Sequence, residues 1–476
     1  MDFEAIIGLE IHAQMSTKTK MFCRCDNDSF GKEPNINVCP VCMGFPGQLP
    51  VVNEEAVKKG VKAALALNCG IPEYCKFDRK NYFYPDNPKG FQISQFDEPL
   101  SKSGYIEIDD DGKMIKIGIT RLHLEDDAGK LTHVMNGSLV DFNRAGTPLM
   151  EIVSDPDIRT PEQAKTYAQE IQKILRYVGS SEADMEKGMM RFDASVSIRP
   201  KGDKKLYPRA EIKNLNSFKA LETAIKYEIS RQKQLWEDTE NPLNGPVTVG
   251  WDDDKQETYF MRDKEESDDY RYFPEPDVPP LHLSKDLVDG LRKEVPELPN
   301  VKKAKYMKDM GITEEEALVI ISDLNIANYF EEVVKLTDDV KTTASFLLTV
   351  LMKYLREDLI SINAQKVTPK MMAELINMIK NGDISHNLAK GEIFEDMYKT
   401  GKSPSEIAKS KGIKQISDVS AIEAICKKII DANPGPVNDV KSGKDKAIGF
   451  LIGQVMKEMK GQGNPGIVNE IMRKLL

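Results

Sequence analysis

A short acidic run after a predicted strand is the stretch of this sequence best suited to chemistry. Residues 119–125 alternate as a half-buried strand does, with one face formed by Ile119, Arg121, His123 and Glu125. Two more acids, Asp126 and Asp127, follow directly. Carboxylate oxygens beside an imidazole suit a divalent cation such as magnesium, although a solvated acidic turn would show the same run. By itself the stretch leaves both interpretations open.

Three other predicted strands repeat this combination of a polar face and an apolar face. Their polar faces carry, in chain order, Glu10 and His12, then Arg191 and Asp193, then Glu211 and Lys213. Any one of them alone could be an ordinary surface strand. Four such strands together predict a sheet whose one side is a shared acidic site.

A basic and aromatic loop over residues 77–89 is a second candidate binding element. Arg79 and Lys80 supply positive charge close to Tyr82, and two prolines restrict the backbone. Such a loop could hold the phosphates and the base of a nucleotide. A packed aromatic loop explains the same composition equally well.

Four of the seven cysteines are spaced as a metal site. Cys23-x-Cys25 and Cys39-x-x-Cys42 form two close pairs joined by a short loop, the pattern of a closed tetrahedral zinc site. With four protein ligands and no open position, such a zinc would be structural. The alternative is four unrelated buried thiols.

The familiar nucleotide-binding and hydrolase motifs are missing. The sequence contains neither Gly-x-x-x-x-Gly-Lys-Ser/Thr nor Gly-x-Gly-x-x-Gly after a strand, so any nucleotide is held in another way. No cysteine or serine stands in an evident hydrolase motif.

Composition and length bound the class of protein. At 476 residues the chain exceeds one ordinary core, and its net charge is −10. Residues 403–476 nevertheless carry 12 Lys and Arg against 8 Asp and Glu, which hints at an anion-binding tail. The start Met-Asp-Phe-Glu lacks a basic or apolar leader, and no apolar run is long enough to span a membrane. We therefore expect a cytoplasmic protein without a membrane anchor.

The predicted secondary structure changes along the sequence. Strand patterns prevail at first, with helices predicted at 53–67 and after Thr160. From Ser284 onward the pattern is of amphipathic helices, with Thr313, Thr337 and Thr368 as predicted caps. This predicts strands and helices in the first part, a helical region from Ser284 and a final helical piece from Ser403, within the two to four domains expected for this length.

Five long strings together resemble one family, the GatB subunits of the tRNA-dependent amidotransferases, which belong to the GatCAB complex. They are Ile7–His12, Lys76–Lys89, Leu122–Lys130, Asp141–Leu149 and Ser267–Asp277. The resemblance runs over essentially the whole chain. It implies an α+β fold of three domains: a mixed-sheet cradle domain over residues 1–292 that holds the active site, a helical domain over residues 293–402, and a tail over residues 403–476, like the protein YqeY, that touches tRNA.

The resemblance also implies a reaction. ATP would phosphorylate the side-chain carboxylate of glutamate or aspartate mischarged on tRNA, and ammonia from a partner amidase subunit would displace the phosphate. The partners would be the amidase subunit GatA and the small subunit GatC. The cofactors would be ATP and magnesium, with structural zinc resting on the cysteine spacing of this chain.

The resemblance assigns roles residue by residue. The magnesium and phosphate site would comprise Glu10, His12, Glu125, Asp126, Asp193 and Glu211, with Glu10, His12 and Glu125 on the metal. From the residues themselves, we also expect Arg79, Lys80, Tyr82 and Arg191 to hold the nucleotide and its transferred phosphate. The positive charge of the tail and its glycine turn predict that tRNA meets Lys457, Lys460, Gly461 and Gly463. Two other functions remain possible: a non-catalytic RNA-binding scaffold and a free-standing ligase.

Overall fold

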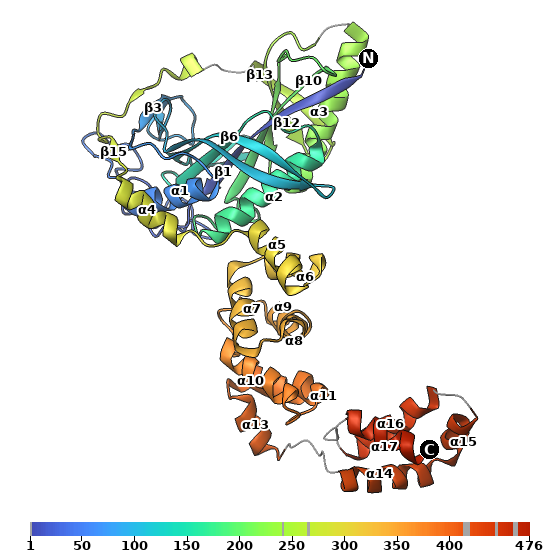
Figure 1. The fold of residues 1–476 in the computed structure, drawn as a ribbon. Coiled ribbons are helices and arrows are strands. Elements are labelled where there is room, and N and C mark those ends of the chain that lie inside the picture. Colours follow the sequence, from blue (N-terminus) through green and yellow to red (C-terminus); the bar gives the residue numbers. More distant parts are fainter. Residues whose placement is uncertain (1, 240–241, 264–266, 413–418, 443–445, 460–464) are drawn as a thin grey trace. The chain divides into compact units, whose positions relative to one another are not determined.

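The computed structural model describes residues 2–239, 242–263, 267–412, 419–442, 446–459 and 465–476 (Figure 1). The chain forms two compact units, Met1–Pro299 and Asn300–Leu476. Three hydrophobic cores lie within them, one in the first unit and two in the second. Among the described residues, no helix is both long and apolar enough to cross a bilayer.

An eight-stranded sheet organises the first unit. Its strands are β1 (Phe3–Gln14), β5 (Ser101–Asp110), β6 (Lys113–Asp126), β9 (Pro148–Ser154), β10 (Met190–Pro200), β11 (Ala210–Leu215), β12 (Val247–Asp252) and β13 (Glu257–Asp263). The spatial order is β13-β12-β11-β10-β1-β9-β6-β5. Only β11 and β12 run parallel, and the other neighbours are antiparallel. The sheet is mixed, and the predicted α+β class is confirmed.

Three helices pack on the apolar side of this sheet (Figure 1): α1 (Glu54–Ala66), α2 (Pro161–Tyr177) and α3 (Phe218–Thr239). Each helix begins after a capping side chain. For α1, the Asn53 side chain accepts a hydrogen bond from the Ala56 amide at 3.2 Å. Ile7, Leu9 and Ile11 of β1 are at most 1% exposed in this core. Since side chains alternate along a strand, Glu10 and His12 lie on the opposite side.

The predicted alternation fails at one end of β6. The pairing of β6 with β9 shifts register between Ile119 and Arg121, a β-bulge. Ile119 is therefore fully buried in the apolar core, and does not share the face of Arg121 as the period of two predicted. Thr120 faces the other way and donates to Asp155 at 2.6 Å.

Small sheets and loops border the polar side. A three-stranded sheet joins β14 (Phe273–Pro274), β3 (Asp78–Asn81) and β4 (Phe91–Ser94), and β4 contacts β6. The remaining strands pair as β2 (Tyr74–Cys75) with β15 (Leu281–His282) and β7 (Lys130–Val134) with β8 (Gly137–Asp141). Part of the predicted loop 77–89 is thus a strand. A 3-10 turn, η1 (Ser267–Tyr270), and helix α4 (Lys285–Glu294) complete the unit.

The second unit is helical. The second of the three hydrophobic cores belongs to this unit. It is built from α5 (Pro299–Met310), α6 (Glu314–Ile320), α7 (Leu324–Thr337), α8 (Val340–Phe346), η2 (Leu347–Leu351), α9 (Met352–Asp358), α10 (Pro369–Lys380), α11 (His386–Leu388), η3 (Ala389–Ile393), α12 (Phe394–Thr400) and α13 (Pro404–Ser410). The third core joins α14 (Val419–Ala432), α15 (Pro434–Lys441), α16 (Lys446–Glu458) and α17 (Pro465–Leu475). Because Ile407 of α13 packs in the second core, the predicted boundary at residue 403 falls inside a packed group; the three-domain division stays a prediction.

Two of the three predicted threonine caps are confirmed. Thr313 and Thr368 accept hydrogen bonds from the first turns of α6 and α10. Thr337 is wrong as a cap, because it ends α7 and its hydroxyl donates to the Val333 carbonyl at 3.0 Å. Asp339 caps the next helix instead, accepting from the Thr342 amide at 3.0 Å.

Candidate active site

Five neighbouring strands in the middle of the large sheet bring the predicted acids together. β1 lies between β10 and β9, so Glu10 is opposite Asp193 and His12 is opposite Glu151. On the next strand, β6, His123 is also opposite Glu151. Directly opposed side chains in a sheet are close enough to interact. The polar face thus forms two groups of metal-ligating side chains.

The first group, the imidazole cluster, consists of His12, Glu125 and Glu151, whose ligand atoms all lie within 4.8 Å of one another. His12 Nε2 is 3.3 Å from Glu151, and His123 Nε2 is 3.6 Å from both glutamates. Ser94 donates to Glu125 at 3.0 Å, which fixes that carboxylate. His12 Nδ1 is buried without a hydrogen-bond partner in the described part of the chain. The opposite ring nitrogen, Nε2, is the one beside Glu151, and an imidazole nitrogen grouped with two carboxylates suits a divalent cation.

The electrostatics of this cluster favour positive charge. Burial by itself would lower the pKa of His12, but the hydrogen bond and the charge of Glu151 together raise it. Burial would raise the pKa of Glu151, yet His123 and His12 hold it well below its usual range. The cluster therefore attracts either a proton or a metal ion at neutral pH.

The second group, the carboxylate cluster, consists of Glu10, Asp193 and Glu211, again with ligand atoms within 4.8 Å of one another. The ammonium of Lys213 reaches Asp193 at 2.8 Å and Glu211 at 3.1 Å. Burial opposes the charge of Lys213, but the two acids raise its pKa above the usual range. This cluster thus carries a cation of its own.

A continuous cleft, here called the acidic cleft, joins both clusters. It consists of two hollows of about 820 and 1070 Å³, including space open to solvent, which share His12, Lys80, Asp193 and Lys213. Their volumes lie within or just above the range of small-molecule sites. Tyr82 lines the first hollow and Glu211 lines the second. The cleft is large enough for more than one reactant.

Several cations other than Lys213 line this cleft, among them Lys80 and Arg191. Burial opposes the charge of Lys80, but Tyr272 and the carboxylates Glu125 and Glu151 raise its pKa. Arg191 is anchored to Asp127 at 3.2 Å. Burial would raise the pKa of Asp127, whereas Arg144 and Arg191 lower it to about 2. A fixed guanidinium and a permanently charged ammonium can stabilise a phosphoryl group during transfer.

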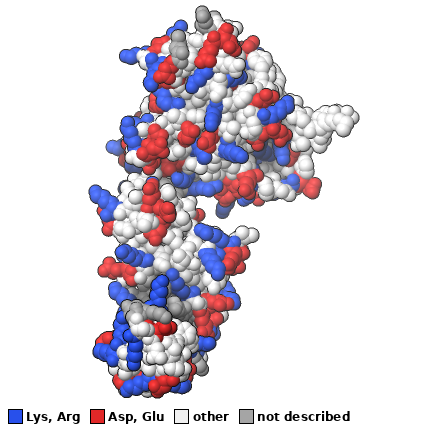
Figure 2. All heavy atoms as spheres, turned by 90° about the vertical axis from the view of Figure 1, so that its right-hand side faces the viewer, with Lys and Arg blue, Asp and Glu red and all other residues white. Residues whose placement is uncertain are grey.

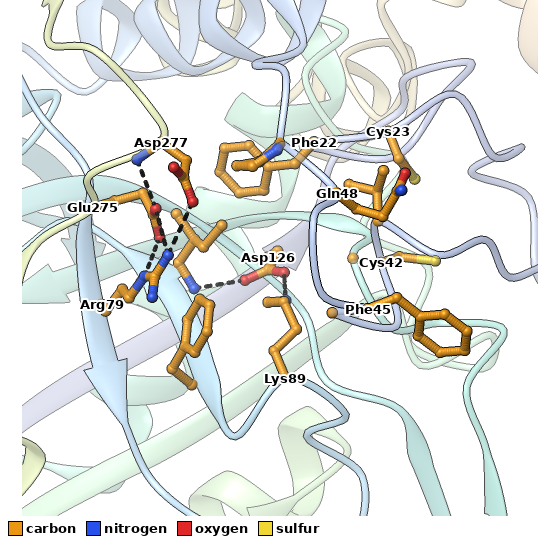
Figure 3. A pocket seen from close by; sticks show the side chains of 16 residues that line it. Phe22, Cys23, Cys42, Phe45, Gln48, Arg79, Lys89, Asp126, Glu275 and Asp277 are labelled. Atoms are coloured by element: carbon orange, nitrogen blue, oxygen red, sulfur yellow. Dashed lines mark hydrogen bonds and ion pairs between the residues drawn. The ribbon is translucent and has the colours of Figure 1, made fainter.

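Two predicted residues, Asp126 and Arg79, lie elsewhere, in a separate pocket beside the cysteines (Figure 3). Asp126 accepts from the Ile93 amide at 2.9 Å and forms an ion pair with Lys89. Arg79 donates to Glu275 at 2.7 and 2.9 Å and lies 4.2 Å from the Phe91 ring centre. The structure thus brings neither residue to the clusters, because each points to the other side of its strand.

Sequence reasoning assigned no role to Glu151, whereas it placed His123 beside the acids of one candidate site and Lys213 on the polar face of another strand. Glu151 is 7% exposed and is the one charged residue of β9, within Pro-Leu-Met-Glu-Ile-Val-Ser. A lone acid inside an apolar strand is costly unless it is partnered. That signal was present in the sequence and could have singled it out.

The four predicted zinc ligands do gather. The sulfur atoms of Cys23, Cys25, Cys39 and Cys42 lie within 4.8 Å of one another. The Cys39 amide donates to the Cys42 sulfur at 3.2 Å, and Lys20 Nζ lies 3.9 Å from it. The hydrogen bond from Cys23 and these groups lower the pKa of Cys42 despite its burial. The set is one that could hold a metal such as zinc.

The tail residues predicted to meet tRNA are only partly described. Lys457 lies on α16 and is exposed, whereas Lys460, Gly461 and Gly463 fall outside the described residues. Other lysines of the tail form ion pairs with glutamates: Lys428 with Glu458 at 2.7 Å, and Lys474 with Glu470 at 2.7 Å. On the face that Figure 2 shows, basic and acidic side chains are interspersed.

Comparison with known proteins places this geometry in a family. The GatB/GatE catalytic domain matches residues 5–289, and the GatB domain matches residues 328–476. The B subunit of the aspartyl/glutamyl-tRNA(Asn/Gln) amidotransferase from Carboxydothermus hydrogenoformans is 47% identical over 480 residues, covering 100% of this chain and 99% of the relative. That from Persephonella marina is 47% identical over 480 residues, covering 100% of both. That from Clostridium botulinum is 46% identical over 473 residues, covering 99% and 98%. The chain therefore belongs to the GatB family, the B subunits of the aspartyl/glutamyl-tRNA(Asn/Gln) amidotransferases, as its resemblance predicted.

Proposed function

We propose that this chain is the amide-forming subunit of a tRNA-dependent amidotransferase. It would use ATP to phosphorylate the side-chain carboxylate of glutamate on tRNA(Gln), of aspartate on tRNA(Asn), or of both. Ammonia would then attack the acyl carbon, and phosphate would leave with formation of the amide. The observation that carries the proposal is the pairing of two ligand clusters with Lys80 and Arg191 in one cleft.

The residues of the cleft account for the phosphoryl step. The substrate carboxylate and the γ-phosphate are both anions and repel each other. Lys80 and Arg191 would stabilise the transferred group, and Asp127 keeps Arg191 in position. The imidazole and carboxylate clusters would hold magnesium, which when bound screens charge on the phosphates.

The ammonia would come from another chain. We propose that the amidase subunit GatA releases it from glutamine, and that the small subunit GatC completes the complex in the cytoplasm. The first unit carries the cleft, while structural zinc at the four cysteines would stabilise the loop between β1 and α1. Under this division of labour, the chain by itself does not hydrolyse glutamine.

The test uses the assembled complex with Glu-tRNA(Gln) and, separately, Asp-tRNA(Asn). With ATP, magnesium and glutamine, the attached amino acid should be converted to its amide on at least one of the two. Magnesium-dependent ATP consumption should accompany each conversion. Tight tRNA binding without either activity would favour the RNA-binding scaffold and overturn the proposal.

We infer further that the tail, residues 403–476, contacts tRNA phosphates, with Lys457 among the contacts. Replacing Lys457 by Ala should weaken tRNA binding equally for cognate and non-cognate tRNA and reduce the salt slope of log Kd by about 1. The comparison variant is Lys474→Ala, whose side chain is already paired with Glu470. An unchanged slope for Lys457→Ala across a salt series would remove this residue from the interface.

A further inference from the structure

Arg79 lies outside the acidic cleft, yet it is the neighbour of Lys80, which lies inside it. The two side chains leave β3 on opposite sides, Arg79 into the pocket of Figure 3 and Lys80 into the cleft. The segment 270–277, here called the strap, runs along β3 and pairs with it through β14. β3 and the strap thus border both the pocket and the cleft.

A bidentate ion pair joins Arg79 to the strap. Its Nε and Nη2 donate to the two carboxylate oxygens of Glu275 at 2.7 and 2.9 Å, and Nη2 also donates to Asp277 at 3.2 Å (Figure 3). The Phe91 ring, 4.2 Å from the guanidinium carbon, helps to orient it. The Glu275 side chain is fully buried. Because an unpaired charge is costly to bury, this carboxylate depends on Arg79 to stay where it is.

Besides this ion pair, a short ladder and one side chain join the strap to β3. β14 contributes two residues to the ladder, and the Glu275 amide donates to the Phe77 carbonyl at 2.9 Å. The Asn81 side chain donates to the carbonyls of Tyr270 and Arg271 at 3.1 and 2.8 Å. So short a ladder is only marginally stable by itself. The ion pair should therefore determine how closely the strap lies against β3.

The strap also forms the surroundings of Lys80 in the cleft. Lys80 Nζ lies 4.9 Å from the centre of the Tyr270 ring, and Tyr270 and Tyr272 line the same hollow as Lys80. The Tyr272 ring stacks on Phe96, with 4.2 Å between the ring centres. An ammonium is attracted to an aromatic face, which restricts the flexible lysine side chain. A displaced strap would release Lys80 from its position.

We propose that Arg79 is a positioning residue, which holds the strap against β3 and thereby keeps the Lys80 ammonium where the phosphoryl group is transferred. This inference rests on the proposed function, in which Lys80 stabilises that group. Arg79 acts without touching the substrate, so its loss should lower kcat and leave the KM for ATP nearly unchanged. The alternative is the sequence-based expectation that Arg79 holds the nucleotide directly.

The experiment is a double-mutant cycle between Arg79 and Lys80 in the assembled complex, with charged tRNA, ATP, magnesium and glutamine. Arg79→Met should lower the kcat of amide formation about a hundredfold, as misplacement of a reacting group does. In the Lys80→Met background it should have no further effect, because the group that it positions is gone. Equal losses in the two backgrounds would overturn the inference.

A second variant separates positioning from direct binding and from misfolding. Arg79→Met leaves the Glu275 carboxylate buried without its cation, whereas Arg79→Met with Glu275→Leu removes both charges, a replacement that proteins often tolerate. The double variant should recover most of the lost kcat, and it decides the question if Arg79→Met alone does not assemble. A double variant that assembles but stays as slow as Arg79→Met would show that the guanidinium itself is needed, and the inference would fail.

Arg231→Met is the matched control. Arg231 donates to Glu228 at 2.9 and 2.6 Å, and this carboxylate is also fully buried, but on α3, on the other side of the sheet. Arg231→Met should lower the unfolding temperature and leave kcat unchanged. A loss of kcat as large as that of Arg79→Met would make the effect a general one of unpaired carboxylates and overturn the inference.

The outcomes also separate the inference from the proposed function. If the original complex converts neither Glu-tRNA(Gln) nor Asp-tRNA(Asn), the proposed function fails. If conversion proceeds and Lys80→Met slows it while Arg79→Met does not, only the inference fails. If Lys80→Met is as fast as the original chain, the inference fails together with the role of Lys80, and ATP-dependent amide formation stands.

Discussion

The two clusters of the acidic cleft start two residues apart on β1 but neutralise their acids by different means. The carboxylate cluster contains the ammonium of Lys213, at 2.8 and 3.1 Å from two of its members. In the imidazole cluster, His12 and His123 lie nearest the acids, and an imidazole is charged only when protonated; the guanidinium of Arg121 lies 4.0 Å from Glu151. One cluster therefore has a permanent cation hydrogen-bonded to two of its acids, whereas the cations nearest the acids of the other are exchangeable. The imidazole cluster should therefore depend more strongly on a bound metal ion than the carboxylate cluster does.

The largest expected effect is on catalysis, from His12→Ala in the imidazole cluster. Amide formation should fall by roughly a thousandfold, or about 4 kcal/mol in the transition state, because charge on the phosphoryl group is no longer screened. Glutamine hydrolysis by the partner should persist at its basal rate, and added ammonium should not rescue the variant.

The matched control is His133→Ala, since His133 is exposed on the β7–β8 hairpin. It should leave amide formation unchanged. Near-normal conversion by His12→Ala under saturating ATP and magnesium would show that the imidazole cluster is dispensable, and the contrast between the clusters would lose its functional meaning.

The second effect concerns binding of metal without turnover. At magnesium concentrations about a hundredfold above Kd, a single site adds about 2.7 kcal/mol to the free energy of unfolding. Glu151→Gln keeps the shape of the side chain but removes one charge, so thermal unfolding with and without magnesium should show most of this gain lost. Glu162→Gln, at an exposed position of α2, serves as the control. A full magnesium-dependent gain in Glu151→Gln would place the ion elsewhere.

A third change should act in the opposite direction. Lys213→Met removes the built-in cation from the carboxylate cluster, which should then bind magnesium about tenfold more tightly, or by about 1.4 kcal/mol. Without magnesium the variant should unfold at a lower temperature, because three acids repel one another. Lys213→Arg retains the charge and should differ little from the original chain. Magnesium affinity is measured by isothermal titration. Equal affinities of Lys213→Met and Lys213→Arg would contradict the proposed difference between the two clusters.

The smallest expected effect on the cleft comes from the cysteines. Cys25→Ser should abolish binding of the one zinc ion expected per chain, as measured by elemental analysis. It should also loosen the cysteine loop near Cys42 and Gly146. The stabilisation by magnesium should stay the same, because thiolates and carboxylates select different metals. Protein purified without chelators that contains no zinc would refute the assignment, and a lost magnesium response would show that the two metal sites are coupled.

Periodicity of two was sufficient to predict which residues share the polar face, as Glu10, His12, Glu125 and Asp193 show. The same period also separates Arg79 from Lys80 on β3, so their different locations could have been foreseen. Close pairs of cysteines are equally local, and the four sulfur atoms lie together as their spacing predicted.

The division of the acids into two clusters could not be predicted in this way. It depends on β1 lying between β9 and β10, and so on pairings between residues more than a hundred positions apart. The bulge that buries Ile119 adds one residue to β6 and leaves no mark on the sequence pattern. Strand order and register are set by the whole core, whereas alternation is set by each strand.

The position of β1 at the centre of the sheet has a consequence for synthesis of the protein. Its two neighbours, β9 and β10, begin at Pro148 and Met190, so the first strand made must wait for both. At ribosomal rates of 5–20 residues per second, the delay until β10 emerges is roughly 10–40 s. During that time the unpaired edges of β1 are available to other chains. Non-local pairing of this kind also slows folding, so the cleft should be among the last parts of its unit to form. A chaperone that covers the nascent N-terminal segment should therefore benefit the cleft before other parts of the unit.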